Sequence, residues 1–542
     1  MVGCVYLTRQ NHQEASITPK AQDTNLDVQA WTDFVEAKIS TSDASQKTLS
    51  IIFIGDVSFS RGVGQMIKLQ KSANYPFAKT VGYLKNADLT IANLETPITE
   101  GRDIQNGEMV FRSNPGTEDA LKWAGIDIVN LANNHTPDFE EIGIKDTIEY
   151  LTNAGIKFMG AGESLNQAIE PLIIEKNSIK IAFVSFTDPS LVSPKYEATE
   201  TSAGTAFMKL DLLKTTITKA KNQADFVIVS MHSGTEYELE PNNTQVTFAQ
   251  SAIDYGADIV IGHHPHVIEP IRQYKGKYII YSLGNYILDQ MWSQETREGL
   301  IAKIIITEKG VESIAFNTTQ IENYSQPRII YTDQNTKPLA RLQTNLNIQP
   351  TAYWDESNKK YALGDQKFIG NDNALAASSS IQTEDLNKDR TVETYELKVG
   401  QLTITSNNKT VWQSPTTWWI DSFRLADVNN DGTADINMSV WKQGSFDKYL
   451  PIWQNQNDMS IKNHFFVFDL NEKLEVHPVW QSSNLAKPNC NFDIYDINND
   501  GKNELITQEG DYLEDYSCKT TNYGVWNWDQ FGFTNIWNSN IQ

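Results

Sequence analysis

The chain has few cysteines, no long apolar run and no excess of basic residues. Three cysteines among 542 residues are too few to indicate a cellular compartment by number alone. No run of 18 or more apolar residues occurs, so the sequence as written has no membrane-spanning helix. The 68 acidic and 45 basic residues give a formal net charge of −23, which argues against nucleic-acid binding because that depends on basic surface. A negatively charged substrate would need bound cations or a local basic pocket.

The positions of the cysteines leave two questions open. Cys490 and Cys518 lie in one C-terminal part and either pair in an oxidising compartment or are two unrelated thiols. The start, Val2-Gly3-Cys4, resembles the end of a bacterial lipoprotein signal, although the basic and apolar regions that should precede it are missing. We therefore expect an extracytoplasmic protein of the cell envelope, anchored through a lipid on Cys4 or through a missing N-terminal segment.

A chain of this length needs two or more cores, and its patterning changes along the sequence. Residues 1–48 are polar, apart from a possible helix around Val28–Ile39, and are interpreted as a tether. In 49–325, runs rich in β-branched residues, such as SIIFIGD and ADIVIG, alternate with helix-like stretches, such as GIKDTIEYLTNAG. This alternation predicts an α/β domain with βαβ units and a largely parallel or mixed sheet. Residues 326–380 are interpreted as a linker or a partial blade.

The remaining segment, 381–542, contains a repeat. VWQSP (411–415), VWQSS (479–483) and IWNSN (536–540) recur, and Asp-rich loops are interleaved with them. Repeats of this length are typical of β-propeller blades or a related β-array, so we expect an all-β, propeller-like domain. Three units are too few for an ordinary closed propeller, so they form an open array or recruit the preceding segment as another blade.

The Asp-rich loops have the spacing of calcium ligands. Oxygen side chains at positions one, three and five converge on one point, and glycine at position six allows the sharp turn. An acid follows at position nine, whereas an EF-hand needs it at position twelve, where Met438 and Thr507 stand. The pattern resembles FG-GAP/integrin-type repeats, which implies Ca²⁺ in the second and third copies; in the first, Arg390 replaces glycine. The alternative is an Asx-rich turn without metal. The expected calcium ligands are Asp427, Asn429, Asp431, Asp435, Asp496, Asn498, Asp500 and Glu504.

Five of the eight histidines follow strand-like runs in the α/β region. In an open α/β sheet, sites form beyond the carboxyl ends of the strands. Carboxylates and amides occupy the same places in other runs, and carboxylates combined with imidazoles suit Mn, Fe or Zn. Two such ions roughly 4 Å apart would activate a water for hydrolysis or phosphoryl transfer. Any one of these residues alone could be an ordinary strand-end turn or a satisfied histidine, but five converging segments favour a site.

Several long motifs of this region resemble one family. GDVSFSRGVG, NLETPIT, GIDIVNLANNHTPDFEEIG, HSGTEYE, GADIVIGHHPHV and YSLGNYI are similar, in order, to motifs of the CapA family. These are proteins of poly-γ-glutamate capsule synthesis, related to the calcineurin-like metallophosphoesterases. The resemblance covers about residues 48–325 and implies an αββα sandwich with a metal centre.

Residue by residue, the resemblance implies a set of roles. The implied metal ligands are Asp56, Glu95, Asn134, His232, His264 and His266. The implied catalytic residues are His135 as a general acid, Asp56, Arg61 as an anion clamp, and Glu236. The implied substrate-binding residues are Asn93, Asn133, His263 and Asn285. Two positions depart from the phosphoesterase pattern: Ser58 stands where a histidine ligand would be, and an Asn-Leu-Glu segment replaces the one that carries the bridging aspartate.

Three functions remain open at this point. The first is a metal-dependent hydrolase or transferase acting on an anionic envelope polymer or its phosphorylated precursor. The second is a non-catalytic component that binds or exports polyglutamate, alongside other capsule-synthesis membrane proteins. The third is a calcium-dependent adhesion or glycan-binding protein, in which the C-terminal repeats carry the function.

Overall fold

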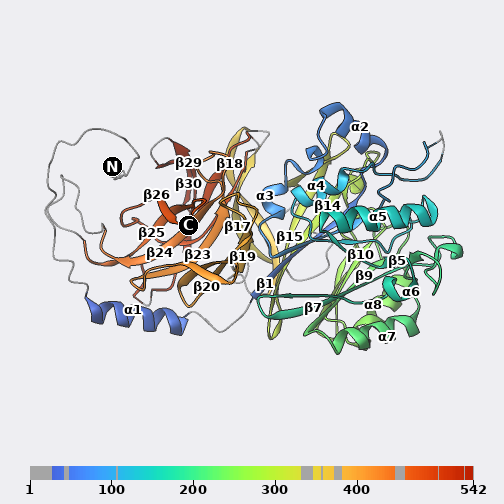
Figure 1. The fold of residues 1–542 in the computed structure, drawn as a ribbon, viewed down its shortest axis with the longest axis horizontal. Coiled ribbons are helices and arrows are strands. Elements are labelled where there is room, and N and C mark those ends of the chain that lie inside the picture. The colour runs from blue at the N-terminus through green and yellow to red at the C-terminus, as the bar shows by residue number, and fades with distance from the viewer. Residues whose placement is uncertain are drawn as a thin grey trace. The chain divides into compact units, whose positions relative to one another are not determined.

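The structure is a computed structural model, and the chain divides into two compact units (Figure 1). The α/β unit comprises Lys47–Pro350 and Gly364–Ala377, and the β unit comprises Met1–Gln46, Thr351–Leu363 and Ser378–Gln542. The structure describes residues 27–41, 48–104, 108–330, 346–355, 358–370, 381–445, 458–498, 500–514, 516–529 and 532–540. Cys4 and the predicted linker end, 371–380, lie outside these ranges. The domain boundaries drawn from the sequence stay predictions.

The larger sheet has ten strands in the order β17-β18-β15-β14-β1-β2-β3-β4, with β13 beside β1 and β16 beside β15. Strands β1 to β4 are parallel, whereas β14 runs antiparallel to β1. The strands are β1 (Thr48–Val57), β2 (Leu89–Leu94), β3 (Ile128–Asn130), β4 (Lys157–Met159), β13 (Asn285–Ile287), β14 (Glu298–Thr307), β15 (Gly310–Glu322), β16 (Gln326–Ile330), β17 (Asn347–Asp355) and β18 (Lys360–Gly370).

The second sheet has six strands in the order β11-β12-β10-β9-β7-β6, and its four inner strands β12, β10, β9 and β7 are parallel. A separate two-stranded pair joins β5 (Ala161–Gly162) to β8 (Gly204–Thr205). Both large sheets therefore mix parallel and antiparallel strands, and the predicted α/β class is confirmed. The strands are β6 (Leu172–Lys176), β7 (Ile179–Thr187), β9 (Phe226–His232), β10 (Ile259–His263), β11 (Ile271–Tyr274) and β12 (Lys277–Ile280).

The two sheets pack face to face, and helices cover their outer faces. Along β1, Ile51 and Phe53 belong to the core between the sheets, whereas Ile52 and Ile54 pack under helices. Strands buried on both faces need apolar residues at every position, which explains the continuous apolar runs. Over the larger sheet lie α2 (Arg61–Gln70), α3 (Val81–Leu84), α4 (Thr117–Trp123) and α5 (Glu140–Ala154). Over the second sheet lie α6 (Leu165–Ala168), α7 (Leu210–Lys221) and α8 (Asn243–Tyr255). Short 3-10 turns are η1 (Tyr75–Phe77), η2 (Pro194–Tyr196) and η3 (Glu295–Arg297).

Aspartates that precede the parallel strands fix how neighbouring strands align. The Asp88 carboxylate accepts a hydrogen bond from the backbone N–H of Ser50 at 2.8 Å. Asp127 does the same for Thr90 at 2.8 Å. In the second sheet, the Asp258 carboxylate accepts from the N–H at position 227, at 2.9 Å. The aspartates of the Ala-Asp and Ile-Asp pairs before these strands thus help to set the register between neighbouring strands. With this register, the carboxyl ends of the strands lie side by side at the opposite edge of the sheet.

The β unit contains three four-stranded antiparallel sheets, each formed by four consecutive strands. In every sheet an Asp-rich loop connects the first two strands, and the VWQS-like segment lies on the last strand. The repeat read from the sequence is therefore a structural repeat. The described strands form no closed sheet, so a propeller is not shown. The strands are β19 (Ile381–Glu384), β20 (Glu393–Lys398), β21 (Gln401–Ser406), β22 (Lys409–Gln413), β23 (Trp418–Ala426), β24 (Asp435–Gln443), β25 (Ile461–Leu470), β26 (Val476–Gln481), β27 (Asn489–Tyr495), β28 (Glu504–Gly510), β29 (Thr520–Asp529) and β30 (Gly532–Asn540).

Helix α1 (Val28–Thr41) corresponds to the helix predicted near the N-terminus, and it packs within the β unit. The fully buried Phe34 lies against Trp419 and Trp441, and Lys38 forms an ion pair with Asp421 at 3.0 Å. This part of the predicted tether is thus held by an aromatic cluster.

Of the two alternatives left open for Cys490 and Cys518, the structure has the paired one, because the two residues form a disulfide. No described helix combines the length and the apolar character needed to cross a membrane.

Glu269 is a buried acid away from the strand ends, and it predicts a pH effect on stability. Gln245 Nε2 donates to its Oε2 at 2.6 Å, and Oε1 has no hydrogen-bond partner. Burial raises the pKa of Glu269 from 4.5 to about 8. The folded state therefore keeps a proton that the unfolded chain releases, and the free energy of unfolding falls as pH rises through this window. We expect Glu269→Gln to remove this contribution and to gain stability relative to the wild type at pH 8 more than at pH 5. Thermal unfolding at both pH values checks this, and an unchanged pH dependence contradicts it.

Candidate metal centre

The predicted site residues come together because the strands that carry them are neighbours in register. On the larger sheet, Asp56 in β1 pairs with Asn93 in β2 and with Asn285 in β13. On the second sheet, the last residues of β9 and β10, His232 and His263, pair with each other. The carboxyl ends of both sheets thus deliver their polar residues to one place, as expected for α/β folds.

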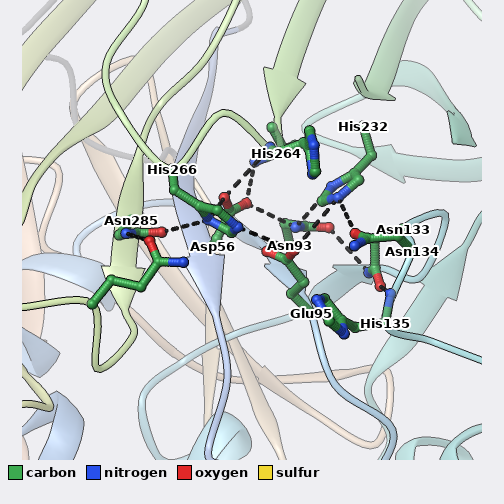
Figure 2. Close-up of polar contacts among 12 residues, drawn as sticks. Asp56, Asn93, Glu95, Asn133, Asn134, His135, His232, His264, His266 and Asn285 are labelled. Carbon is green, nitrogen blue, oxygen red and sulfur yellow. Dashed lines mark hydrogen bonds and ion pairs between the residues drawn. The ribbon is translucent and has the colours of Figure 1, made fainter. Parts of the chain in front are cut away.

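Asp56 and Glu95 are the two carboxylates at the centre of the site (Figure 2). His263 Nδ1 lies 3.3 Å from Asp56 Oδ1, and His266 Nδ1 lies 3.3 Å from Asp56 Oδ2. Glu95 Oε1 lies 3.5 Å from His232 Nε2 and 3.8 Å from His266 Nε2. Both carboxylates are fully buried. Such charges inside a protein are costly unless they are paired or bind a cation.

Two overlapping groups of side chains are arranged to hold a cation. One is Asp56, Glu95 and His232, the other is Glu95, His264 and His266, and within each group the ligand atoms lie within 4.8 Å of one another. Five of the six predicted metal ligands belong to these groups. The sixth, Asn134, places its Oδ1 2.7 Å from His232 Nε2. Glu95 belongs to both groups, which is the position expected of a bridging carboxylate.

The electrostatics of the site fit a metal ion. Burial raises the pKa of Glu95 well above its usual range, and the charge of Asp56 adds to this effect. Burial also acts to raise the pKa of Asp56, but hydrogen bonds and charge from its histidine neighbours outweigh it and hold that pKa well below its usual range. Burial lowers the pKa of His264 to about 3 and that of His232 well below its usual range. The imidazoles of His232 and His264 are therefore neutral, and the neutral imidazole is the form that binds metal.

Unsatisfied atoms identify where a cation would bind. Neither Glu95 oxygen has a hydrogen-bond partner, and His264 Nδ1 also lacks one. Buried polar atoms nearly always have partners, so three unsatisfied atoms on two residues of one ligand group need an explanation. A divalent cation coordinated by carboxylate oxygens and imidazole nitrogens supplies it, and this donor set suits Mn, Fe or Zn.

The segment after β10 is held in an unusual backbone conformation. His264 has φ 100° and His266 has φ 59°, on either side of Pro265. Positive φ strains any residue with a Cβ and tends to persist at functional sites, where the surroundings impose it. Here the His264 N–H points at Asp56 Oδ2, at 3.4 Å, and the Pro265 carbonyl accepts from the N–H of Tyr237 at 2.8 Å.

Comparison with known proteins places the chain in a family. Residues 50–290 match the family described as bacterial capsule synthesis protein PGA_cap. The capsule biosynthesis protein CapA of Bacillus anthracis is 32% identical over 341 residues, which are 61% of this chain and 82% of that protein. The chain belongs to the bacterial capsule synthesis protein family. The PGA biosynthesis protein CapA of Bacillus subtilis (strain 168) is 34% identical over 269 residues, 49% of this chain and 70% of that protein.

The segment that matches the family, residues 50–290, contains every residue of the candidate metal centre and none of the C-terminal sheets. The likeness of these sheets to FG-GAP repeats stays a prediction. Among solved structures, the calcineurin-like phosphoesterase YfkN from Bacillus subtilis aligns over 52% of this chain and 88% of its own, at 14% identity and a TM-score of 0.28. That score is too low to support an argument about fold or chemistry.

A network of asparagines beneath the carboxylates positions them within this capsule-family domain. Asn93 Nδ2 donates to Asp56 Oδ1 at 2.8 Å. Asn93 Oδ1 in turn accepts from Asn130 Nδ2 at 2.9 Å and from Asn133 Nδ2 at 3.3 Å. All three asparagines are fully buried. Asn93 and Asn133, predicted to bind substrate, thus have protein groups as their hydrogen-bond partners. Asn130, the last residue of β3, was missed because the apolar run of the sequence continues past it through Leu131 and Ala132.

His135, the predicted general acid, has two neighbours that the sequence did not reveal as functional. Its Nδ1 lies 2.7 Å from Asp138 Oδ2, and its ring stacks on Phe111 with centroids 3.8 Å apart. The Asp138 carboxylate also accepts from the N–H of Phe111 at 2.6 Å. Asp138 therefore fixes both the ring orientation and the residue on which the ring stacks. The Asn-His-Thr-Pro-Asp spacing was the available signal.

Arg61 and Glu236 belong to neither ligand group. Arg61 forms an ion pair with Asp289, and its guanidinium carbon lies 4.4 Å from the centre of the Phe111 ring. The positive charge of Arg61 is therefore paired with the Asp289 carboxylate, and a role as an anion clamp would have to compete with this ion pair. Glu236 is exposed, and its charge contributes to raising the pKa of Glu95. It thus lies at the rim of the site.

Proposed function

We propose that this protein is a metal-dependent hydrolase or transferase that acts on an anionic polymer of the cell envelope, poly-γ-glutamate, or on its phosphorylated precursor. One observation carries the proposal: Glu95 is shared by two ligand groups, and both of its buried oxygens lack a hydrogen-bond partner. The predicted relation to calcineurin-like metallophosphoesterases is part of this proposal. Two-metal sites activate water for attack, and Glu95 would be a ligand in both groups if each held a cation.

The residues of the chain divide the work. Asp56, Glu95, Asn134, His232, His264 and His266 would hold Mn, Fe or Zn, which supplies Lewis-acid activation of water and of a substrate oxygen. Asn93 and His263 hold the Asp56 carboxylate in place. His135 is oriented by Asp138 through Nδ1, which leaves Nε2 to exchange a proton with the substrate.

Family membership supports the polymer class and the location. Two relatives are named for capsule and PGA biosynthesis, which supports a substrate of the envelope and partners among other capsule-synthesis proteins. The disulfide Cys490–Cys518 supports an oxidising, extracytoplasmic compartment. Attachment to the membrane through Cys4 is part of the same proposal.

Measuring product formation by the metal-loaded protein tests the proposal. The full chain is stripped with a chelator, reloaded with Mn, Fe or Zn, and assayed on phosphoesters and on γ-linked glutamate polymers. Product that depends on the reloaded metal and disappears in His232→Ala supports a hydrolase or transferase. Polymer binding that metal enhances, without product, supports the alternative of a non-catalytic binding or export component. Product formation that persists in His232→Ala contradicts the assignment of the site.

A second binding function is proposed for the β unit, namely Ca²⁺ in the loops Asp427–Asp435 and Asp496–Glu504. In both loops the first aspartate accepts from the N–H groups of positions five and six, within 3.0 Å. The acid at position nine is buried in both, and Asp435 Oδ2 has no partner. Burial, together with the loop charges, raises the pKa of Asp435 and of Glu504 to about 8. A cation would stabilise both carboxylates, and a calcium-dependent adhesion or glycan-binding role of blade-like sheets would build on it.

Calcium titration checks this second function. We expect two Ca²⁺ ions per chain, each contributing a stabilisation of about 2.7 kcal/mol when free calcium is 100 times the dissociation constant. Asp427→Ala and Asp496→Ala should each remove one ion. Asp385→Ala is the matched control, because in its loop Arg390 occupies the left-handed position six at φ 74°. Calorimetry that finds no calcium, or no loss in the two variants, refutes the site.

A further inference from the structure

An exposed pair of aromatic rings lies beside the metal centre. Tyr237 is 42% exposed and Trp292 is 63% exposed, although both are large and apolar. Their ring centroids are 5.8 Å apart and their planes meet at 81°, so the rings contact each other edge to face and form a corner. The Tyr237 ring lies 6.3 Å from the ring of His266. The corner is therefore next to a proposed metal ligand.

The corner is tied to the metal centre by hydrogen bonds. His266 Nδ1 lies 2.9 Å from Asn285 Oδ1, and Asn285 Nδ2 donates to Gln290 Oε1 at 3.1 Å. Gln290 Nε2 then approaches the Tyr237 hydroxyl at 3.4 Å. Tyr237 has φ 68°, a strained value for a residue with a bulky side chain. The surroundings thus hold an exposed aromatic residue in a costly conformation, which is a mark of function rather than of packing.

The charges around the corner favour a cation. Glu236 and Glu238 flank Tyr237 and are exposed. The charge of Glu236 acts on both Tyr237 and Glu95, because it adds to the effect of burial in raising the pKa of each. The nearby guanidinium of Arg61 is matched by Asp289. Aromatic faces attract cations, Trp most strongly, and a ring corner beside a carboxylate is a recurring way to bind an ammonium group.

We propose that Tyr237, Trp292 and Glu236 bind the ammonium group of the substrate, beside the metal centre. The inference rests on the proposed function and narrows its substrate. A metal centre takes carboxylate or phosphate oxygens, and the corner takes a positive charge, so the ligand carries both groups close together. The amino-terminal residue of a γ-linked glutamyl chain does so, because its α-ammonium and α-carboxylate share one carbon. Glu236, predicted to be catalytic, thereby has a binding role.

Two synthetic ligands test the subsite on the metal-loaded full chain. One is γ-linked triglutamate with a free α-amine, and the other is the analogue with a glutaryl end, in which hydrogen replaces the ammonium group. We expect the free amine to bind about tenfold more tightly by calorimetry. Trp292→Leu and Glu236→Gln should reduce this ratio to about one to two. Trp123→Leu is the matched control, since Trp123 is also exposed and lies on α4, and it should keep the tenfold ratio.

The outcomes separate this inference from the proposed function. Equal binding of both ligands to the wild type, or an unchanged ratio in both rim variants, overturns the ammonium subsite while leaving a metal-dependent site intact. If neither ligand binds to protein whose metal content is confirmed, the polymer assignment fails. The subsite is then judged by n-butylammonium against 1-butanol in saturation-transfer NMR. Signals for the ammonium alone, lost in Trp292→Leu, support it, and no signal overturns it.

Discussion

We expect Glu95→Gln to abolish transition-metal binding without unfolding the protein. The substitution keeps the shape of the side chain but removes the negative charge shared by the two ligand groups. Loss of a group that only orients a metal ligand already lowers metal affinity about 10- to 100-fold. Loss of a ligand shared by both groups should therefore lower metal affinity by more than about 100-fold. Because burial and the charge of Asp56 raise the pKa of Glu95, ionising this group in the folded protein costs free energy, and the amide removes that cost. The apo variant should therefore be at least as stable as the apo wild type.

Elemental analysis after dialysis, together with metal titration, measures this effect. Glu269→Gln is the matched control, because Glu269 is also a buried acid whose pKa burial raises, yet its neighbour is Gln245 rather than the metal centre. It should retain the full metal content. His232→Ala should lose metal as Glu95→Gln does. Full metal content in Glu95→Gln would show that this carboxylate is not a ligand.

Much of the α/β unit was predictable because its strands are buried on both faces. Residues such as Ile51, Ile52, Phe53 and Ile54 leave no helical periodicity, and the turn-forming aspartates mark where strands begin. The helix Glu140–Ala154 ends at Gly155, which has φ 73° as its C-cap, where the sequence placed its end. The division into two facing sheets could not be read locally, because strands of both sheets have the same composition.

Most of the residues that the structure brings together at the candidate site could be predicted from the sequence, but their geometry could not. Strand ends mark Asp56, Glu95 and His232, since polar residues that follow apolar runs lie at the sheet edge. Nothing local predicts the positive φ of His264 and His266, because contacts from distant segments impose it. The aromatic corner could not be predicted either, because the position of Tyr237 beside His266 depends on loops that are separate in the sequence.

Asp138→Asn is expected to slow turnover about 10²- to 10⁴-fold while leaving metal content unchanged. Asparagine preserves the acceptor for the N–H of Phe111, so the loop should keep its shape. Its amide oxygen can take the place of Asp138 Oδ2, which lies against both the N–H of Phe111 and His135 Nδ1, but it carries no negative charge to stabilise the imidazole when the ring is protonated. A comparable exchange in serine proteases also lowers kcat strongly. The loss should appear in kcat rather than in KM, because the substrate is held by other groups.

A double variant shows whether Asp138 acts through His135. If it does, Asp138→Asn combined with His135→Ala is no slower than His135→Ala alone, because groups that act as a unit are strongly non-additive. Multiplicative losses would instead assign Asp138 a separate role, such as support of Phe111 and of the stacked Arg61. Turnover of Asp138→Asn within about twofold of the wild type would remove His135 from the proton-transfer step, since general acid–base groups contribute far more than that. The metal centre would then have to act with a different proton donor.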